Sequence, residues 1–257
     1  MRSPLCYLGG KSRLAPVIVP KIPPDNECYC EPFCGAAWIL FAKEPSRCEV
    51  INDLDGELVT FWRVVQNHLI PFLDYFKFAV VSRRIFELEN MKRPETLTDL
   101  QRAVRYYYIQ RLAFGGKPKG RTYGTVMSGS PRLNLTDISE TLLEVHQRLE
   151  RVNVECLDAL ECIARYDRKG TFFFIDPPYI FNQDDYAVSF DRFQDLATLL
   201  GKLKGRFILT MTDCPEVRQI FGAFKISTVR LKYSISLPKT GDDSRAQDRK
   251  EVIVQNY

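Results

Sequence analysis

Runs of consecutive apolar residues alternate along this chain with segments in which apolar side chains recur every three or four positions. Continuous apolar runs are typical of strands buried on both faces, and the wider spacing is typical of helices that bury one face. The pattern predicts a strand that runs into a glycine turn within 25–35, and further strands at 48–51, 152–156, 171–175, 207–211 and 251–254. We expect the last of these near the edge of a sheet.

Helices are predicted between the strands, at 36–42, over several segments from 58 to 109, and at 193–203. Residues 115–134 are rich in Gly, Pro and Ser, which predicts a loop or hairpin. The alternation of elements predicts an open α/β sheet with helices on both faces, interrupted by a mainly helical insertion. We place the sheet in residues 1–57 and 145–257 and the insertion in 58–144.

Composition supports a folded chain with one large domain, or one domain that carries an insertion. Its 257 residues are 45% apolar and 26% charged, which excludes a disordered tail and a disulfide-stapled miniprotein. The net charge of +4 names no partner, but seven basic residues and no acidic ones lie between Arg102 and Arg132. The rest of the chain has 29 basic and 32 acidic residues. A basic segment of this kind usually faces a polyanion.

The N-terminal residues lack the apolar core of a secretory signal, and no stretch approaches the roughly 18 apolar residues of a membrane span. We therefore expect a cytoplasmic protein that does not bind membranes. Cys28, Cys30, Cys34 and Cys48 invite a zinc interpretation, but paired C-x-x-C spacing is missing and both histidines lie far away in sequence. We expect buried thiols there and no metal site.

Asp176-Pro177-Pro178-Tyr179 follows the apolar run 171–175, at the end of a strand where open α/β sheets place their active sites. An Asp-Pro-Pro sequence alone is also a common turn, but its position and the aromatic residue after it favour a site. The two prolines hold the backbone extended and rigid. An acidic side chain, a main-chain carbonyl and an aromatic ring are thereby held together. Such a set can accept both N–H groups of a planar aromatic amine while its ring stacks.

This tetrapeptide belongs to an ordered series of motifs that resembles the Dam-like family of S-adenosylmethionine-dependent DNA adenine-N6 methyltransferases. The series consists of Tyr7-Leu8-Gly9-Gly10-Lys11, Glu31-Pro32-Phe33-Cys34-Gly35-Ala36-Ala37, Asn52-Asp53, Asp158, Asp176-Pro177-Pro178-Tyr179, Gly205-Arg206-Phe207-Ile208-Leu209, Thr212-Asp213 and Glu251-Val252-Ile253-Val254. The family often has F-x-G-x-G where this chain ends in Ala37, and we expect only a slightly altered loop. The resemblance implies a Rossmann-like methyltransferase sheet with a target-recognition insertion that carries a hairpin loop.

The resemblance also implies a site for S-adenosylmethionine. The turn from Glu31 to Gly35 would lie beneath the methionine part, Asp53 would accept hydrogen bonds from the ribose hydroxyls, and Asp158 would lie near the adenine ring of the cofactor. For Asp53 the alternative is a helix N-cap. The residues implied to bind the cofactor are Tyr7, Gly9, Gly10, Lys11, Glu31, Pro32, Phe33, Gly35, Asp53, Asp158 and Asp176.

Gly10-Lys11-Ser12 is also similar to the end of a phosphate-binding loop, which would indicate a nucleotide hydrolase. The glycine required five positions earlier is Leu5, and no strand is predicted before it, so this interpretation is disfavoured. The family resemblance implies instead that the glycines permit close approach and that Lys11 meets the cofactor's carboxylate or the nearby substrate. Tyr7 would add an aromatic wall.

The expected catalytic residues are Asp176, Pro177, Pro178 and Tyr179. Asp176 and the Pro177 carbonyl would accept the amino hydrogens of an adenine flipped out of the duplex, and the base would stack on Tyr179. Phe181 and Tyr186 are candidates for closing the pocket, with ordinary packing as the alternative.

Double-stranded DNA is the expected partner, bound by a monomer or a weak dimer associated with the nucleoid in a prokaryotic host. The residues expected to contact DNA are Arg111, Lys117, Lys119, Arg121, Tyr123 and Arg132, with a solvated basic face as the alternative. The remaining hypotheses are cytosine-N4 methylation, methylation of RNA or of a protein amide, and a DNA-binding module that keeps the fold without catalysis. A solitary enzyme, a phage enzyme and half of a restriction-modification pair all stay open.

Overall fold

A computed structural model describes residues 1–257 except 8, 182 and 234–246. Its described residues form a seven-stranded sheet in the order β3-β2-β1-β4-β5-β7-β6, in which only β7 runs against the others. The strands are β1 (Cys28–Glu31), β2 (Cys48–Asn52), β3 (Val152–Glu155), β4 (Thr171–Ile175), β5 (Arg206–Thr212), β6 (Lys225–Tyr233) and β7 (Gln247–Gln255). The predicted open α/β sheet is confirmed, and its order is consistent with a Rossmann-like methyltransferase fold.

Helices cover both faces of the sheet. The α-helices are α1 (Ala15–Ile18), α2 (Trp38–Ala42), α3 (Gly56–Asn67), α4 (Leu69–Asp74), α5 (Arg83–Met91), α6 (Asp99–Leu112), α7 (Ile138–Leu149), α8 (Ala159–Tyr166), α9 (Phe193–Leu200) and α10 (Pro215–Ile220). One buried cluster joins α1, α2, α3 and α7 to one face, and a second joins α8, α9 and α10 to the other. No helix among the described residues is long and apolar enough to cross a membrane.

Strand β4 shows why a continuous apolar run belongs at the centre of this sheet. Phe172 and Phe174 point into one cluster, while Phe173 and Ile175 point into the other. Successive side chains of a strand point to opposite faces, so a strand covered on both sides must be apolar at every position. Each fully buried side chain of this size contributes about 1.5–3 kcal/mol, and β4 therefore anchors both cores.

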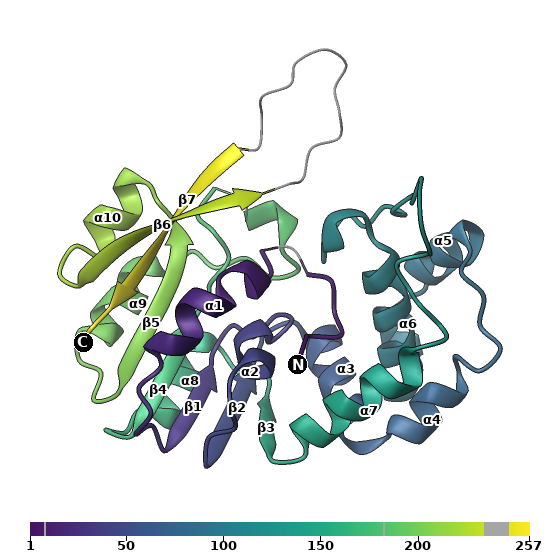
Figure 1. The fold of residues 1–257 in the computed structure, drawn as a ribbon, viewed down its shortest axis with the longest axis horizontal. Coiled ribbons are helices and arrows are strands. Elements are labelled where there is room, and N and C mark those ends of the chain that lie inside the picture. The colour runs from purple at the N-terminus through teal and green to yellow at the C-terminus, as the bar shows by residue number, and fades with distance from the viewer. Residues whose placement is uncertain (8, 182, 234–246) are drawn as a thin grey trace.

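The helices α3 to α7 extend the molecule beyond the β3 edge of the sheet (Figure 1). Phe61 of α3 stacks on Tyr107 of α6 with 5.5 Å between ring centroids, and α6 begins with a capping box of Thr98 and Gln101. The boundaries that we predicted for the insertion, 57/58 and 144/145, fall inside α3 and α7. These two helices therefore belong to both the sheet's cover and the helical unit.

Strand β6 is absent from our sequence prediction. Its first residues, Lys225, Ile226, Ser227 and Thr228, are all exposed except the half-buried Ile226, and they form no apolar run. This is the composition of an edge strand with one solvated face. β7, predicted near the edge, lies next to β6 and one position inside it, and it is longer than the predicted 251–254.

Helix α2 begins at Trp38, two residues later than predicted. Ala37 precedes it in the left-handed conformation, with φ 51° and ψ 39°, and is fully buried. That conformation favours glycine and costs other residues about 1–2 kcal/mol. Ala37 therefore holds a glycine-like turn at the position where the family often has glycine.

The predicted cysteine cluster lies mostly within the sheet. Cys30 and Cys34 are buried, and Cys28 and Cys48 are half-buried with 3.4 Å between their sulfurs. Burial raises the pKa of the Cys28 thiol to about 12, so it stays protonated. Among the described residues, no three His, Cys, Asp or Glu side chains are arranged to hold a metal ion.

Glu49 of β2 forms a buried charge network that joins α2 to α7. Its carboxylate accepts hydrogen bonds from Lys43 at 2.5 Å and from Arg148 at 2.5 and 2.8 Å. Burial raises the pKa of Glu49, but the hydrogen bonds from Arg148 and Lys43 outweigh it, and the net pKa lies below its usual value. The network's contribution is therefore present above the unfolded pKa of about 4.3 and is lost as the pH falls through the lower folded pKa.

We predict that Glu49→Ala lowers the free energy of unfolding at pH 7 by about 3–5 kcal/mol, because it leaves the buried Lys43 ammonium without its partner and removes the carboxylate from Arg148. Urea denaturation measures the change. Arg165→Ala is the matched control, because it breaks the exposed Arg165–Glu161 pair, and it should cost less than about 1 kcal/mol. Equal losses in the two variants would contradict the prediction.

Candidate active site

Three carboxylates meet at the carboxyl ends of the central parallel strands. Glu31 ends β1, Asp53 follows β2 and Asp176 follows β4. Chain order reverses between β1 and β4, and open α/β sheets bind ligands at such a point. A cavity opens there, and all three of these carboxylate residues line it.

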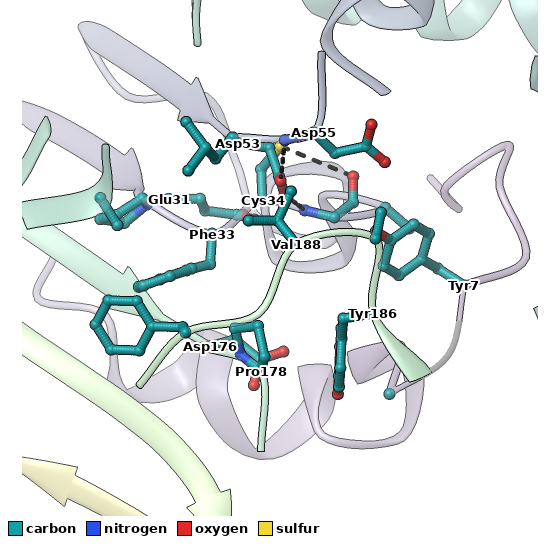
Figure 2. A pocket seen from close by; sticks show the side chains of 18 of the residues that line it. Tyr7, Glu31, Phe33, Cys34, Asp53, Asp55, Asp176, Pro178, Tyr186 and Val188 are labelled. Carbon is teal, nitrogen blue, oxygen red and sulfur yellow. Dashed lines mark hydrogen bonds between the residues drawn. The ribbon is translucent and has the colours of Figure 1, made fainter. Parts of the chain in front are cut away.

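All residues predicted to bind the cofactor line this cavity. They are Tyr7, Gly9, Gly10, Lys11, Glu31, Pro32, Phe33, Gly35, Asp53, Asp158 and Asp176. In Figure 2, Asp53 and Asp176 approach from opposite sides, with Tyr7 and Tyr186 along one wall and Phe33 along another. The sequence motifs thus converge in space, while the binding role of each residue stays a prediction.

Lys11 connects the N-terminal segment to the tetrapeptide after β4. Its ammonium lies 2.9 Å from Asp176 Oδ1 and donates to the Tyr179 hydroxyl at 2.7 Å and to the Gly9 carbonyl at 2.9 Å. Burial lowers the pKa of Lys11, but the Asp176 carboxylate raises it more, so the net pKa is well above the usual value. Lys11 is therefore a buried, protonated cation.

The contacts that hold the Asp176 side chain are made to only one of its two carboxylate oxygens among the described residues. Its Oδ1 receives both the Lys11 ammonium and, at 2.9 Å, the hydroxyl of Thr210 from β5. Among the contacts of the described residues, none is made to Oδ2, and the side chain lines the cavity. Burial raises the pKa of Asp176 and the Lys11 charge opposes this. The second oxygen can thus accept a further hydrogen bond.

Glu31 supports the turn between β1 and α2. Its Oε1 accepts the Leu40 amide and the Tyr29 hydroxyl, both at 2.7 Å. Burial raises the Glu31 pKa to about 8 despite these bonds. Gly35 has a φ of +46°, and a Cβ there would lie 3.2 Å from the Tyr7 ring. The turn therefore requires glycine where the aromatic wall covers it.

Asp53 is not the N-cap of α3, because Asp55 occupies that position and accepts the Glu57 and Leu58 amides. Asp53 instead accepts the Gly35 amide on Oδ2 and the Asp55 amide on Oδ1, both at 3.0 Å (Figure 2). Burial, aided by the charge of Asp55, raises its pKa to about 6. The N-cap alternative for Asp53 is wrong, and its carboxylate keeps lone pairs on the cavity side.

Asp158 caps a helix and also lines the cavity. It caps α8 by accepting the Leu160 amide at 3.1 Å, and it forms an ion pair with Arg192. Its side chain also lines the cavity. A capping residue can therefore face the ligand space when its helix begins at the edge of the site.

The tetrapeptide does not present its aromatic ring as predicted. Asp176 and Pro178 line the cavity, but Pro177 and Tyr179 do not, and Tyr179 is only 9% exposed. The Lys11 ammonium lies 4.8 Å from the Tyr179 ring centroid and holds its hydroxyl, which keeps the ring packed. The aromatic wall on this side is Tyr186, one of the two candidates for closing the pocket.

The segment that closes the cavity was only partly predicted. Phe181 is 64% exposed and lies outside the cavity lining, so its predicted role is wrong in this arrangement. Phe190 lines the cavity and packs edge-on against Phe33, with centroids 5.0 Å apart. Sequence reasoning missed Phe190 because one aromatic residue in a loop carries no periodic signal.

Most arginines of the basic segment are engaged within the fold. Arg102 and Arg105 lie 2.5 and 3.6 Å from Glu57, which lies outside the segment. Arg111 donates to the Pro4 and Arg132 carbonyls. The positive charge that the sequence places in one segment is thus partly neutralised by an acid far away in sequence.

The residues predicted to contact DNA fall into two groups, those that are hydrogen-bonded or packed within the fold and the two lysines of the loop after α6. Arg121 donates to Gln110 and Arg132 donates to the Ala113 carbonyl, so for Arg111, Arg121 and Arg132 the structure favours internal hydrogen bonding. Tyr123 is half-buried and packs edge-on against Phe86. Lys119 is exposed and Lys117 is half-buried. The expected DNA contact therefore moves toward the lysines of the loop after α6.

Comparison with known proteins bears on the whole chain. Residues 7–235 match the family model described as "D12 class N6 adenine-specific DNA methyltransferase". The chain is 24% identical to the Type II methyltransferase M1.LlaDCHI of Lactococcus lactis subsp. cremoris, over 98% of this chain and 94% of that protein. It is 21% identical to the Type II methyltransferase M.CviBI of Paramecium bursaria Chlorella virus NC1A, over 98% of both.

A third relative is the DNA adenine methylase of Haemophilus influenzae, 22% identical over 90% of this chain and 87% of that protein. The family match covers the N-terminal segment, the helical unit and the strands that surround the cavity. Together with the convergence of the family's motifs on one cavity, it identifies the chain as a member of the D12 class N6 adenine-specific DNA methyltransferase family.

Proposed function

We propose that this adenine-specific DNA methyltransferase uses S-adenosylmethionine as methyl donor and acts on an adenine turned out of double-stranded DNA. The observation that carries the proposal is the position of Asp176. One of its oxygens is held by Lys11 and Thr210, and its side chain lines a cavity that Asp53 also lines. A target amine and a cofactor can thereby share one enclosed space.

The residues present fit S-adenosylmethionine. The cofactor has a ribose diol, an adenine ring and a charged methionine end, and it supplies a methyl group activated by a positive sulfur. Asp53 would accept the ribose hydroxyls, Phe33 and Phe190 would flank the adenine ring, and the turn from Glu31 to Gly35 would support the methionine part.

Asp176 and the Pro177 carbonyl would accept the two amino hydrogens of the target adenine. The amine lone pair is normally delocalised into the ring, and two acceptors held in place favour the geometry in which it points toward the methyl donor. Lys11 positions Asp176 and keeps a positive charge beside it. Proton loss can follow the transfer, so no histidine is needed at the site.

Turning the base out of the duplex costs a few kcal/mol, which stacking in the pocket offsets. Tyr186 lines the cavity, so we assign it the first stacking contact, and Tyr179 would contribute only if Lys11 released its hydroxyl. We propose residues 58–144 as the target-recognition unit. Its loop after α6 would contact the phosphates through Lys117 and Lys119.

Expression of the chain in cells that lack adenine methylation tests this function. Sequencing with modification detection should find N6-methyladenine at one short sequence motif, and the Asp176→Ala variant should leave none. Modification of cytosine in place of adenine would contradict the proposed reaction.

We predict that Asp176→Ala lowers the methylation rate at least about a hundredfold, because one of the two acceptors of the target amine is removed. The Kd for S-adenosylmethionine should stay within about tenfold, since Asp53 and the β1 turn are intact. Asp167→Ala is the matched control: Asp167 accepts the Lys204 and Gly205 amides at the opposite end of the sheet. Normal turnover in Asp176→Ala would exclude the role.

Asp53→Ala should weaken S-adenosylmethionine binding by about tenfold to a hundredfold, because hydrogen bonds to a charged group contribute about 1.5–3 kcal/mol. Calorimetry measures the Kd, and Asp53→Asn should retain part of the affinity since it keeps one acceptor oxygen. An unchanged Kd in Asp53→Ala would place the ribose elsewhere.

Replacing Lys117 and Lys119 together with alanine should reduce the slope of log K against log salt for DNA binding by up to about 1.8, which corresponds to two phosphate contacts. The control replaces two exposed lysines at the amino ends of β4 and β5, Lys169 and Lys204. A slope reduced only in the control would move the DNA-binding face to that end of the sheet.

A further inference from the structure

Gln110 is a fully buried polar side chain in the last turn of α6 that touches neither the cavity nor the surface. Its amide nitrogen donates to the Cys6 carbonyl at 2.8 Å and to the Gly116 carbonyl at 2.7 Å. Its amide oxygen accepts from Arg121 at 3.2 Å. One side chain therefore connects the N-terminal segment to the loop after α6.

The two segments are also in direct contact. Gly116 has a φ of +66°, and a Cβ there would lie 2.8 Å from the Cys6 carbonyl carbon and 2.9 Å from the Tyr7 nitrogen. These neighbours are backbone atoms, so any side chain would push the segments apart. This close approach does not depend on the Gln110 hydrogen bonds, and it joins the same two segments.

Each of the two segments belongs to a different binding surface. The N-terminal segment continues from Cys6 into Tyr7, Gly10 and Lys11, which line the cavity. The loop continues from Gly116 into the residues that we assign to phosphate contact. A displacement of either backbone at this junction must therefore move a neighbour that serves the other ligand.

We propose that Gln110 is a positioning residue that couples binding of the methyl donor to binding of DNA. This inference rests on the proposed function of the cavity and of the loop. A ligand that orders one segment reduces the entropy that the second ligand must overcome to order the other, because Gln110 holds both backbones at once. The coupling is reciprocal, since each ligand must tighten the other by the same factor.

Gln110→Met tests the coupling, because methionine has a similar volume but donates no hydrogen bond. Gln66→Met is the matched control. Gln66 also donates to two backbone carbonyls, Leu149 at 2.7 Å and Val152 at 2.8 Å, between α7 and β3. Both variants lose two hydrogen bonds to backbone carbonyls and one that the side-chain oxygen accepts, from Arg121 in Gln110 and from Asn67 in Gln66. Only the first variant removes a contact between the two binding segments, and thermal unfolding measures the stability of both.

The measurement is the Kd of S-adenosylhomocysteine, which carries no methyl group to transfer, by calorimetry. It is made with and without a saturating duplex of the sequence found by modification sequencing. We expect the duplex to tighten this Kd at least about fivefold in the unaltered protein and in Gln66→Met, which is the lower end of typical coupling. In Gln110→Met the factor should fall below about twofold.

Unchanged coupling in Gln110→Met overturns the inference, and so does independent binding of the two ligands by the unaltered protein. If Gln110→Met fails to fold, Gln110→Asn keeps the amide but is one methylene too short to reach both carbonyls, and it should show the same fall. A protein that methylates adenine without coupling leaves the proposed function standing. A protein that binds neither ligand and makes no N6-methyladenine overturns both.

Discussion

The contact on which the site depends is the buried pair of Lys11 and Asp176. A buried charge is costly unless it is paired and hydrogen-bonded, and here the ammonium has three oxygen neighbours and the carboxylate has a second donor in Thr210. The pair ties the N-terminal segment to the end of β4. It thereby places Tyr7 over Gly35 and gives the cavity its wall.

The same pair explains the state of the tetrapeptide. Because Lys11 occupies one oxygen of Asp176 and the hydroxyl of Tyr179, the acid is oriented and the tyrosine is packed away. Asp176 and Tyr186 both line the cavity, whereas Tyr179 does not. The orientation of Asp176 as a hydrogen-bond acceptor thus comes from Lys11, which lies close to the N-terminus of the chain.

In the helical unit, several buried polar side chains have partners that lie far away in the sequence. Glu57 forms ion pairs with two arginines of α6, and Gln110 and Arg111 donate to carbonyls of the N-terminal segment. These contacts join the unit to the catalytic sheet at the point where the cavity wall begins. The position of the helical unit relative to the site is therefore fixed by polar contacts as well as by the shared core of α3 and α7.

Much of the sheet and the cavity lining could be predicted from the sequence. A strand buried on both faces needs an apolar residue at every position, so β4 could be predicted from its apolar run. A motif that follows such a strand lies at the carboxyl edge of the sheet, so the position of Asp176 could be predicted with it. Strand β6 could not be predicted, because an edge strand with one solvated face lacks a continuous run of apolar residues. Phe190 was missed because a single loop aromatic has no period.

The sequence by itself determined the fold class, the order of the motifs and the residues that gather at the carboxyl ends of β1, β2 and β4. Those properties depend on local patterning and on strand direction. Only the tertiary structure decided the partners: that Lys11 holds Asp176 and Tyr179, that Asp55 rather than Asp53 caps α3, and that the arginines of α6 turn inward. These ion pairs and hydrogen bonds join residues that are far apart in the chain, and the spacing of residues along the sequence does not show which distant side chains come into contact.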